Sequence, residues 1–95
     1  MERMTRRTEP GGPAGVAARS LVLDGGEARG EPIERLARFE DAVVELVADQ
    51  ADVSRRLETL RAEGLSKTVR FRELMGRKLT NQFLLVLLRK HGIDA

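Results

Sequence analysis

Few residues in this sequence have the types and spacing that catalytic or metal-binding chemistry requires. His91 is the only histidine, and there is no cysteine. A histidine just before a glycine, at the end of a helical segment, is typical of a terminal residue that interacts favourably with the helix dipole. No carboxylates cluster at metal-ligand spacing, and no serine or threonine has a base nearby in the sequence. We therefore expect no enzymatic activity, no metal ion and no cofactor.

A basic segment, "KTVRFRELMGRK", is the clearest indication of a ligand. Its five cations lie within little more than three helical turns: Lys67, Arg70, Arg72, Arg77 and Lys78. Phosphate backbones bind such clusters, and the binding is steeply salt-dependent. The other interpretation is a solvated face that complements an acidic neighbour, because only Phe71 is available as a stacking aromatic. Nucleic-acid binding by this basic face is therefore the alternative function.

The element expected to lie beside the basic segment is a long helix over residues 32–63. Between Pro32 and Glu63 there is no further proline and no glycine. Apolar residues recur there at spacings of three and four, as in a coiled-coil seam: Leu36, Phe39, Val43, Leu46, Val53, Leu57 and Leu60. Gln50 is the one polar member of this stripe, and two interpretations stay open: a buried polar layer or a partly exposed edge position.

A second helix is expected over residues 69–91, with the inward stripe Phe71, Met75, Leu79, Gln82 and Val86. Gly64 and Gly92 stand where a left-handed residue ends each helix. The following residues, Leu65 and Ile93, can fold back on the last turn, as in a Schellman motif. Gly76 lies inside the second helix and indicates a close backbone crossing.

Opposite charges favour an antiparallel hairpin of these two helices. Residues 31–65 carry nine acids and five bases, a net charge of −4, whereas residues 66–92 carry seven bases and one acid, a net charge of +6. Two adjacent antiparallel helices with complementary flanks satisfy this distribution.

The apolar run "FLLVLL" predicts self-association. One neighbouring helix covers only one side of a helix, yet this run is apolar on every side, and the start of the longer helix extends past the shorter one. A two-fold dimer forming a four-helix bundle supplies the missing neighbours. The predicted interface consists of Leu36, Phe39, Val43, Phe83, Leu84, Val86, Leu87 and Leu88.

The first 31 residues predict a flexible tail. They contain most of the glycines and two of the three prolines, with too little apolar surface to offset the entropy of ordering, although "SLVL" is a possible docked strand. In "GGEARG", Gly30 is followed by Glu31 and Pro32, not by the Lys and Ser or Thr of a phosphate-binding loop. We interpret this segment as a linker.

Together these features predict an all-α fold: a two-helix antiparallel hairpin over residues 32–95 that assembles into a homo-oligomeric bundle, with a disordered tail over residues 1–31. The expected function is a small non-enzymatic scaffold or adaptor that binds itself and another protein. The apolar run is far shorter than the roughly 20 apolar residues of a bilayer-spanning helix. Because no targeting segment is recognisable either, we expect a cytoplasmic protein that does not bind membranes.

Overall fold

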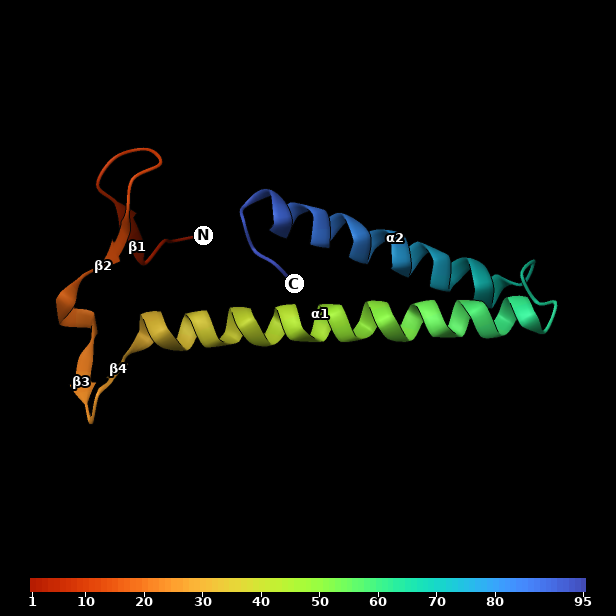
Figure 1. The fold of residues 1–95 in the computed structure, drawn as a ribbon, viewed down its shortest axis with the longest axis horizontal. Helices are drawn as coiled ribbons and strands as arrows, with labels where there is room; N and C mark the ends of the chain where they lie inside the picture. The colour runs from red at the N-terminus through yellow and green to blue at the C-terminus, as the bar shows by residue number, and fades with distance from the viewer. The chain divides into compact units, whose positions relative to one another are not determined.

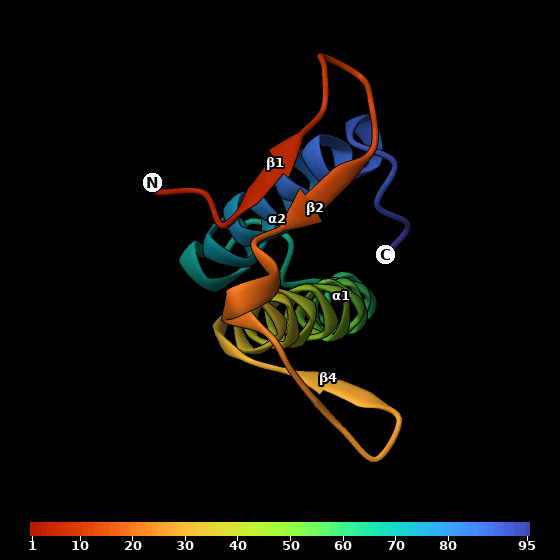
Figure 2. The ribbon, with the colours of Figure 1, turned by 90° about the vertical axis from the view of Figure 1, so that its left-hand side faces the viewer.

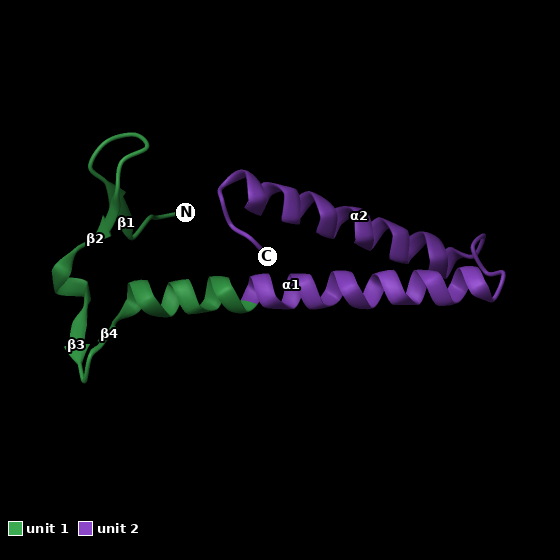
Figure 3. Ribbon diagram, in the orientation of Figure 1, with its two compact units in different colours: residues 1–41 green, residues 42–95 purple.

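The computed structural model describes residues 1–95 and divides the chain into two compact units, Met1–Asp41 and Ala42–Ala95 (Figures 1 and 3). Helix α1 (Glu31–Ala62) begins in the first unit and ends in the second. In chain order the other elements are β1 (Thr5–Arg7), β2 (Ala14–Val16), a 3-10 turn (Ala18–Ser20), β3 (Val22–Asp24), β4 (Glu27–Arg29) and α2 (Val69–Lys90).

The prediction of an all-α fold with a disordered N-terminal tail is wrong. The first unit contains two antiparallel β-hairpins, with β1 paired to β2 and β3 paired to β4. Thr5 lies opposite Val16 in the first pair, which Figure 2 shows side by side, and Val22 lies opposite Arg29 in the second. The segment interpreted as a linker therefore forms regular structure.

Turn chemistry explains this ordering. The loop between β3 and β4 is only Gly25–Gly26, and both residues have positive φ, 57° and 86°. A two-residue hairpin loop needs this conformation, which glycine adopts without a steric cost. No residue of the first unit is fully buried, so the hairpins are held by backbone hydrogen bonds and not by an apolar core. Apolar composition alone does not indicate this kind of order, since it reflects burial and not turn geometry.

Gly30 fixes the junction between the hairpins and α1. Its φ is 142°, and an added Cβ would lie 2.1 Å from the backbone oxygen of Ser20. Its own carbonyl accepts hydrogen bonds from the amides of Ile33 and Glu34, each at 3.0 Å, which begins the helix. Only glycine allows the backbone of this position to approach the 3-10 turn so closely.

In the second unit, α1 and α2 run antiparallel with an apolar core between them (Figure 1). Val53 and Leu57 of α1 and Leu74 of α2 are at most 3% exposed. Leu60, Phe71 and Met75 pack against these three residues. Every predicted stripe position of α1 between residues 43 and 60 is buried or half-buried, which confirms that part of the stripe.

Both predicted helix ends are confirmed as Schellman motifs. The amide of Leu65 donates to the carbonyl of Leu60 at 2.8 Å, and the amide of Ile93 donates to that of Leu88 at 2.9 Å. Gly64 has φ 74°, as the left-handed position of the motif requires. At the start of α2, the side-chain oxygen of Thr68 accepts a hydrogen bond from the amide of Phe71.

The predicted inward stripe of α2 is wrong in its second half, because Leu79, Gln82 and Val86 are exposed. The side that faces α1 in this half consists of Lys78, Asn81, Leu85 and Leu88, all buried or half-buried. Since residues 83–88 are apolar on all sides, their spacing does not define which side faces α1. A polar contact, from Asn81 to α1, marks the inward side.

Candidate functional site

The side of α2 that faces away from α1 exposes several large apolar side chains. Phe83 is 76% exposed, and four further apolar side chains of α2 are each about half exposed: Leu79, Leu84, Val86 and Leu87. Leu88, also predicted as an interface residue, is half-buried. A monomeric protein seldom exposes contiguous apolar side chains of this size, and such surfaces commonly mark an interaction site.

The exposed residues of α2 have the spacing of a helix–helix seam. Gly76, Leu79, Phe83 and Val86 follow at intervals of three, four and three residues, as in a heptad repeat. The close backbone crossing expected at Gly76 does not occur within the chain, because nothing lies within 4 Å of an added Cβ at this position. The glycine is therefore an open position on the exposed seam.

Helix α1 also exposes apolar side chains beyond those that contact α2. In the second unit, Val44 and Val47 are exposed, whereas Val43 is half-buried. In the first unit, the predicted interface residues Leu36 and Phe39 are exposed. Both helices of the second unit therefore carry exposed apolar side chains outside the core between them.

A polar cluster fixes the register of α1 against α2. Arg77 donates two hydrogen bonds to the carboxylate of Asp49, one of them from Nε to Oδ2 at 2.8 Å, and Asn81 Nδ2 donates to Oδ2 at 2.8 Å. Beside it, Gln50 Nε2 donates to the backbone carbonyl of Lys78 at 3.2 Å. The hydrogen bonds from Arg77 and then Asn81 hold the pKa of the Asp49 carboxyl below its usual range.

Sequence reasoning did not find this cluster. No local pattern singles out Asn81, and no pattern in the sequence links Asp49 to Arg77 or Asn81. The available signal was limited to the spacing of Arg77 and Asn81, which are four residues apart and so lie on one face of α2. Gln50, for which two interpretations were open, is half-buried, and its Oε1 has no partner.

The five basic residues predicted as nucleic-acid contacts do not form one free surface. Arg77 is engaged by Asp49, and Lys78 is half-buried. Lys67, Arg70 and Arg72 are exposed and form no ion pair. Arg70 lines a shallow depression of about 270 Å³ whose other cations, Arg55 and Arg56, are both paired with Asp52.

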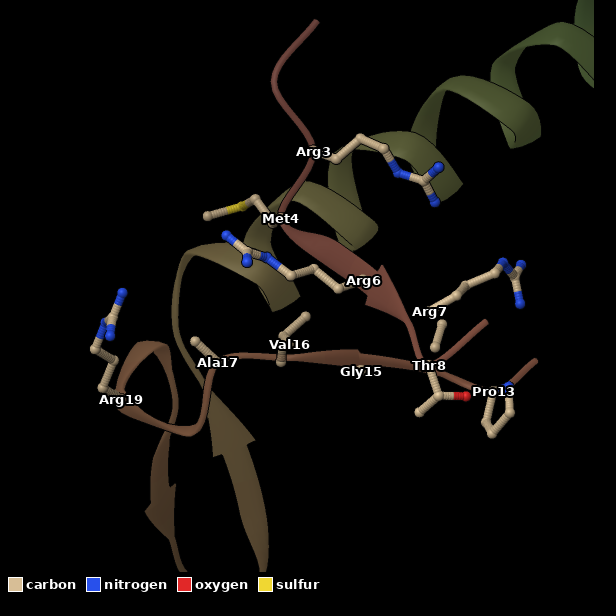
Figure 4. Close-up of a pocket in the computed structure, with 11 residues that line it drawn as sticks. Arg3, Met4, Arg6, Arg7, Thr8, Pro13, Gly15, Val16, Ala17 and Arg19 are labelled. Carbon is tan, nitrogen blue, oxygen red and sulfur yellow. The ribbon is translucent and has the colours of Figure 1, made fainter. Parts of the chain in front are cut away.

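A second basic surface, not anticipated from the sequence, lies on the β1–β2 hairpin. A concavity of about 560 Å³ is bordered there by four arginines, Arg3, Arg6, Arg7 and Arg19 (Figure 4). No aspartate or glutamate lines it. All four arginines lie within the first 20 residues, but their number alone does not indicate a common surface without the pairing of β1 with β2.

The remaining chemical candidates lie apart from one another. His91 caps the C-terminal end of α2, where its amide donates to the carbonyls of Arg89 and Leu88. No group of three or more acidic or histidine side chains is placed to hold a metal ion. Neither helix is both long and apolar enough to cross a membrane.

No family model, curated protein or solved structure matches this chain.

Proposed function

We propose that this chain is a small non-enzymatic scaffold or adaptor that self-associates through the exposed apolar side chains of α1 and α2 and binds another protein. The observation that carries the proposal is the exposed seam Leu79, Phe83 and Val86 with its neighbour Leu87. A two-helix hairpin buries one face of each helix, whereas a four-helix bundle buries two. A second copy of the same hairpin supplies the two additional helices.

Two-fold symmetry doubles what the exposed apolar side chains of α2 contribute to association. Burying a half-exposed Leu or Val contributes about 1 kcal/mol, and burying Phe83 contributes about 2 kcal/mol. In a two-fold dimer each such contribution occurs twice, since the same patch is used by both copies. For the five exposed side chains of α2 the contributions of both copies come to about 12 kcal/mol, whereas association costs roughly 4–15 kcal/mol. A micromolar dimer needs a surplus of about 8 kcal/mol, so this surface supplies it when the cost of association is near the lower end of that range.

The open glycine on the seam supports the same assembly. Gly76 costs α2 about 1 kcal/mol relative to alanine and fills no requirement within the chain, since its added Cβ would meet nothing. A glycine allows a second helix to approach the backbone closely. A two-fold assembly would also carry two copies of the first unit, an arrangement that raises the avidity of a scaffold for a bound protein.

The alternative, nucleic-acid binding by the basic face of α2, has less support. Two of its five residues are not free to bind a ligand: Arg77 donates hydrogen bonds to Asp49 of α1, and Lys78 is half-buried. Three exposed cations remain, Lys67, Arg70 and Arg72, without an aromatic platform. We retain these three residues as a comparison set in the experiments below.

Replacing Phe83 and Leu87 by aspartate tests the proposal. Both side chains are exposed in the single chain, so the core of the hairpin stays intact, while four charges would be buried in a dimer. We expect the wild-type chain to sediment as a dimer and the double variant as a monomer with its helical circular dichroism retained. The matched control, Val22→Asp with Leu23→Asp, changes two exposed residues of the β3–β4 hairpin and should leave the dimer intact. Equal association of both variants would contradict the proposed interface.

A further inference from the structure

The β1–β2 hairpin carries a concave surface whose charge is all of one sign. Four arginines line the concavity, Arg3, Arg6, Arg7 and Arg19, and its other lining residues include the small residues Ala14, Gly15 and Val16. Elsewhere in the chain, arginines are commonly paired with carboxylates, as Arg38 is with Glu31. None of these four forms an ion pair, and neighbouring Glu2 and Glu9 do not line the concavity.

The guanidinium groups are spread and do not converge on one point. In Figure 4, Arg6 and Arg19 extend to one side of the hairpin, whereas Arg3 and Arg7 extend to the other. Arg7 is held in place because its Nη1 donates to the carbonyl of Gly12 at 2.6 Å, which closes the loop between β1 and β2. A ligand with one anionic group would reach only some of these cations, so the arrangement suits a ligand with several separated anions.

From this we propose that the concave surface of the β1–β2 hairpin binds the phosphate backbone of a nucleic acid strand. All four cations are arginines, whose planar guanidinium donates two hydrogen bonds to one phosphate group. A nucleic acid presents a phosphate at every nucleotide, so the four guanidiniums find partners at any register, whereas an acidic peptide must have its carboxylates in a matching order. The small lining residues leave room for the sugars. This inference does not depend on self-association through α2.

Counterion release sets the size of the expected effect. With four phosphate contacts on a single strand, the logarithm of the affinity should fall with the logarithm of salt at a slope of about −3, which is about 50-fold between roughly 50 and 200 mM salt. With Arg7 alone remaining, the same change in salt should weaken binding only about threefold. Net charge alone does not predict this behaviour, because the whole chain is only +2.

The experiment compares two variants of the full chain with equal loss of charge. The first is Arg3→Gln, Arg6→Gln and Arg19→Gln, which spares the loop contact of Arg7. The second, Lys67→Gln, Arg70→Gln and Arg72→Gln, removes the three exposed, unpaired cations of the predicted basic face at the start of α2. Binding to a fluorescent single strand of about 12 nucleotides, and to the duplex of the same sequence, is measured by anisotropy over a salt series.

We expect the wild-type chain and the variant at residues 67, 70 and 72 to bind the single strand or the duplex, with the steep dependence of affinity on salt given above. The variant at residues 3, 6 and 19 should bind at least tenfold more weakly, with the shallow salt dependence. Loss of binding only in the variant at residues 67, 70 and 72, or equal loss in both variants, would overturn the proposal. So would the absence of wild-type binding, or equal wild-type binding to polyglutamate or to phosphatidylserine vesicles.

A second measurement on the unmodified chain guards against misfolding of the variant at residues 3, 6 and 19. Hydrogen–deuterium exchange with and without the oligonucleotide should show protection in residues 3–19. Protection confined to residues 66–78 would contradict the proposal. These outcomes are separable from those of the dimer test, because the Phe83 and Leu87 variant should still bind the oligonucleotide as a monomer.

Discussion

Leu57→Ala tests whether the core between α1 and α2 holds the second unit together. Leu57 is 1% exposed and is one of only three fully buried apolar residues. Truncating a buried leucine costs about 2–5 kcal/mol, and here the half-buried neighbours Leu60 and Met75 are placed to relax into the cavity. We therefore expect a loss of about 3 kcal/mol. A unit of this size has a free energy of unfolding of roughly 3–8 kcal/mol, so the change removes a large part of it.

The assay is thermal unfolding followed by circular dichroism at the helical band, at one fixed protein concentration, because self-association would add stability. A loss of about 3 kcal/mol should lower the midpoint by more than roughly 12 °C. Leu23→Ala is the control: it is the same chemical change at a side chain that is 84% exposed, and it should stay within about 0.5 kcal/mol of the wild type. Equal midpoints for the two variants would refute the assignment of the core.

Three further changes probe other contacts. Gly30→Ala places a Cβ 2.1 Å from the carbonyl oxygen of Ser20, so we expect it to disrupt the junction before α1 and to speed hydrogen–deuterium exchange in residues 18–34; unchanged exchange would contradict this close approach. Asp49 has a pKa below its usual 3.8, so its ionised form stabilises the hairpin above about that pH and loses this effect as the pH falls through the lowered value. Wild-type thermal midpoints should therefore fall toward those of Asp49→Asn in acid, and a constant difference between the two would show that the contact is not formed. Gly76→Ala should raise helix content in dilute, monomeric protein and weaken the dimer, whereas a stronger dimer would exclude a close crossing at this residue.

The parts of the fold that were predicted depend on local signals. Each Schellman motif, with Gly64 or Gly92 as its left-handed residue, lies within six consecutive residues, so the sequence alone identifies the two helix ends. The stripe of α1 from Val43 to Leu60 is also evident, since its members keep the three- and four-residue spacing throughout, whereas Val44 and Val47 between them do not continue such a series toward Leu60.

The missed parts depend on turn position or on contacts distant in sequence. Asp24-Gly25-Gly26, between Val22 and Ala28, is a local sequence pattern typical of a tight hairpin turn. The high glycine content of the whole segment favours a linker instead, which hides this pattern. The inward side of α2 depends on Asn81 meeting Asp49, 32 residues earlier, which no local pattern contains.

Of the two candidate surfaces, one was predicted from the sequence and the other was not. Exposure of Phe83 and Leu87 follows from an apolar run that one neighbouring helix cannot cover, and this was evident from the sequence. The arginine concavity of the β1–β2 hairpin could not be predicted, because it requires Arg6 and Arg19 to be brought to one hairpin by strand pairing that was not expected.

Sedimentation equilibrium of the unmodified chain over a micromolar concentration series tests the central claim most directly. The chain has a mass of 10.6 kDa, and self-association through the exposed seam of α2 predicts a species of twice that mass or more, with dissociation on dilution. A single species of 10.6 kDa at every concentration, with both helices folded, would contradict the account.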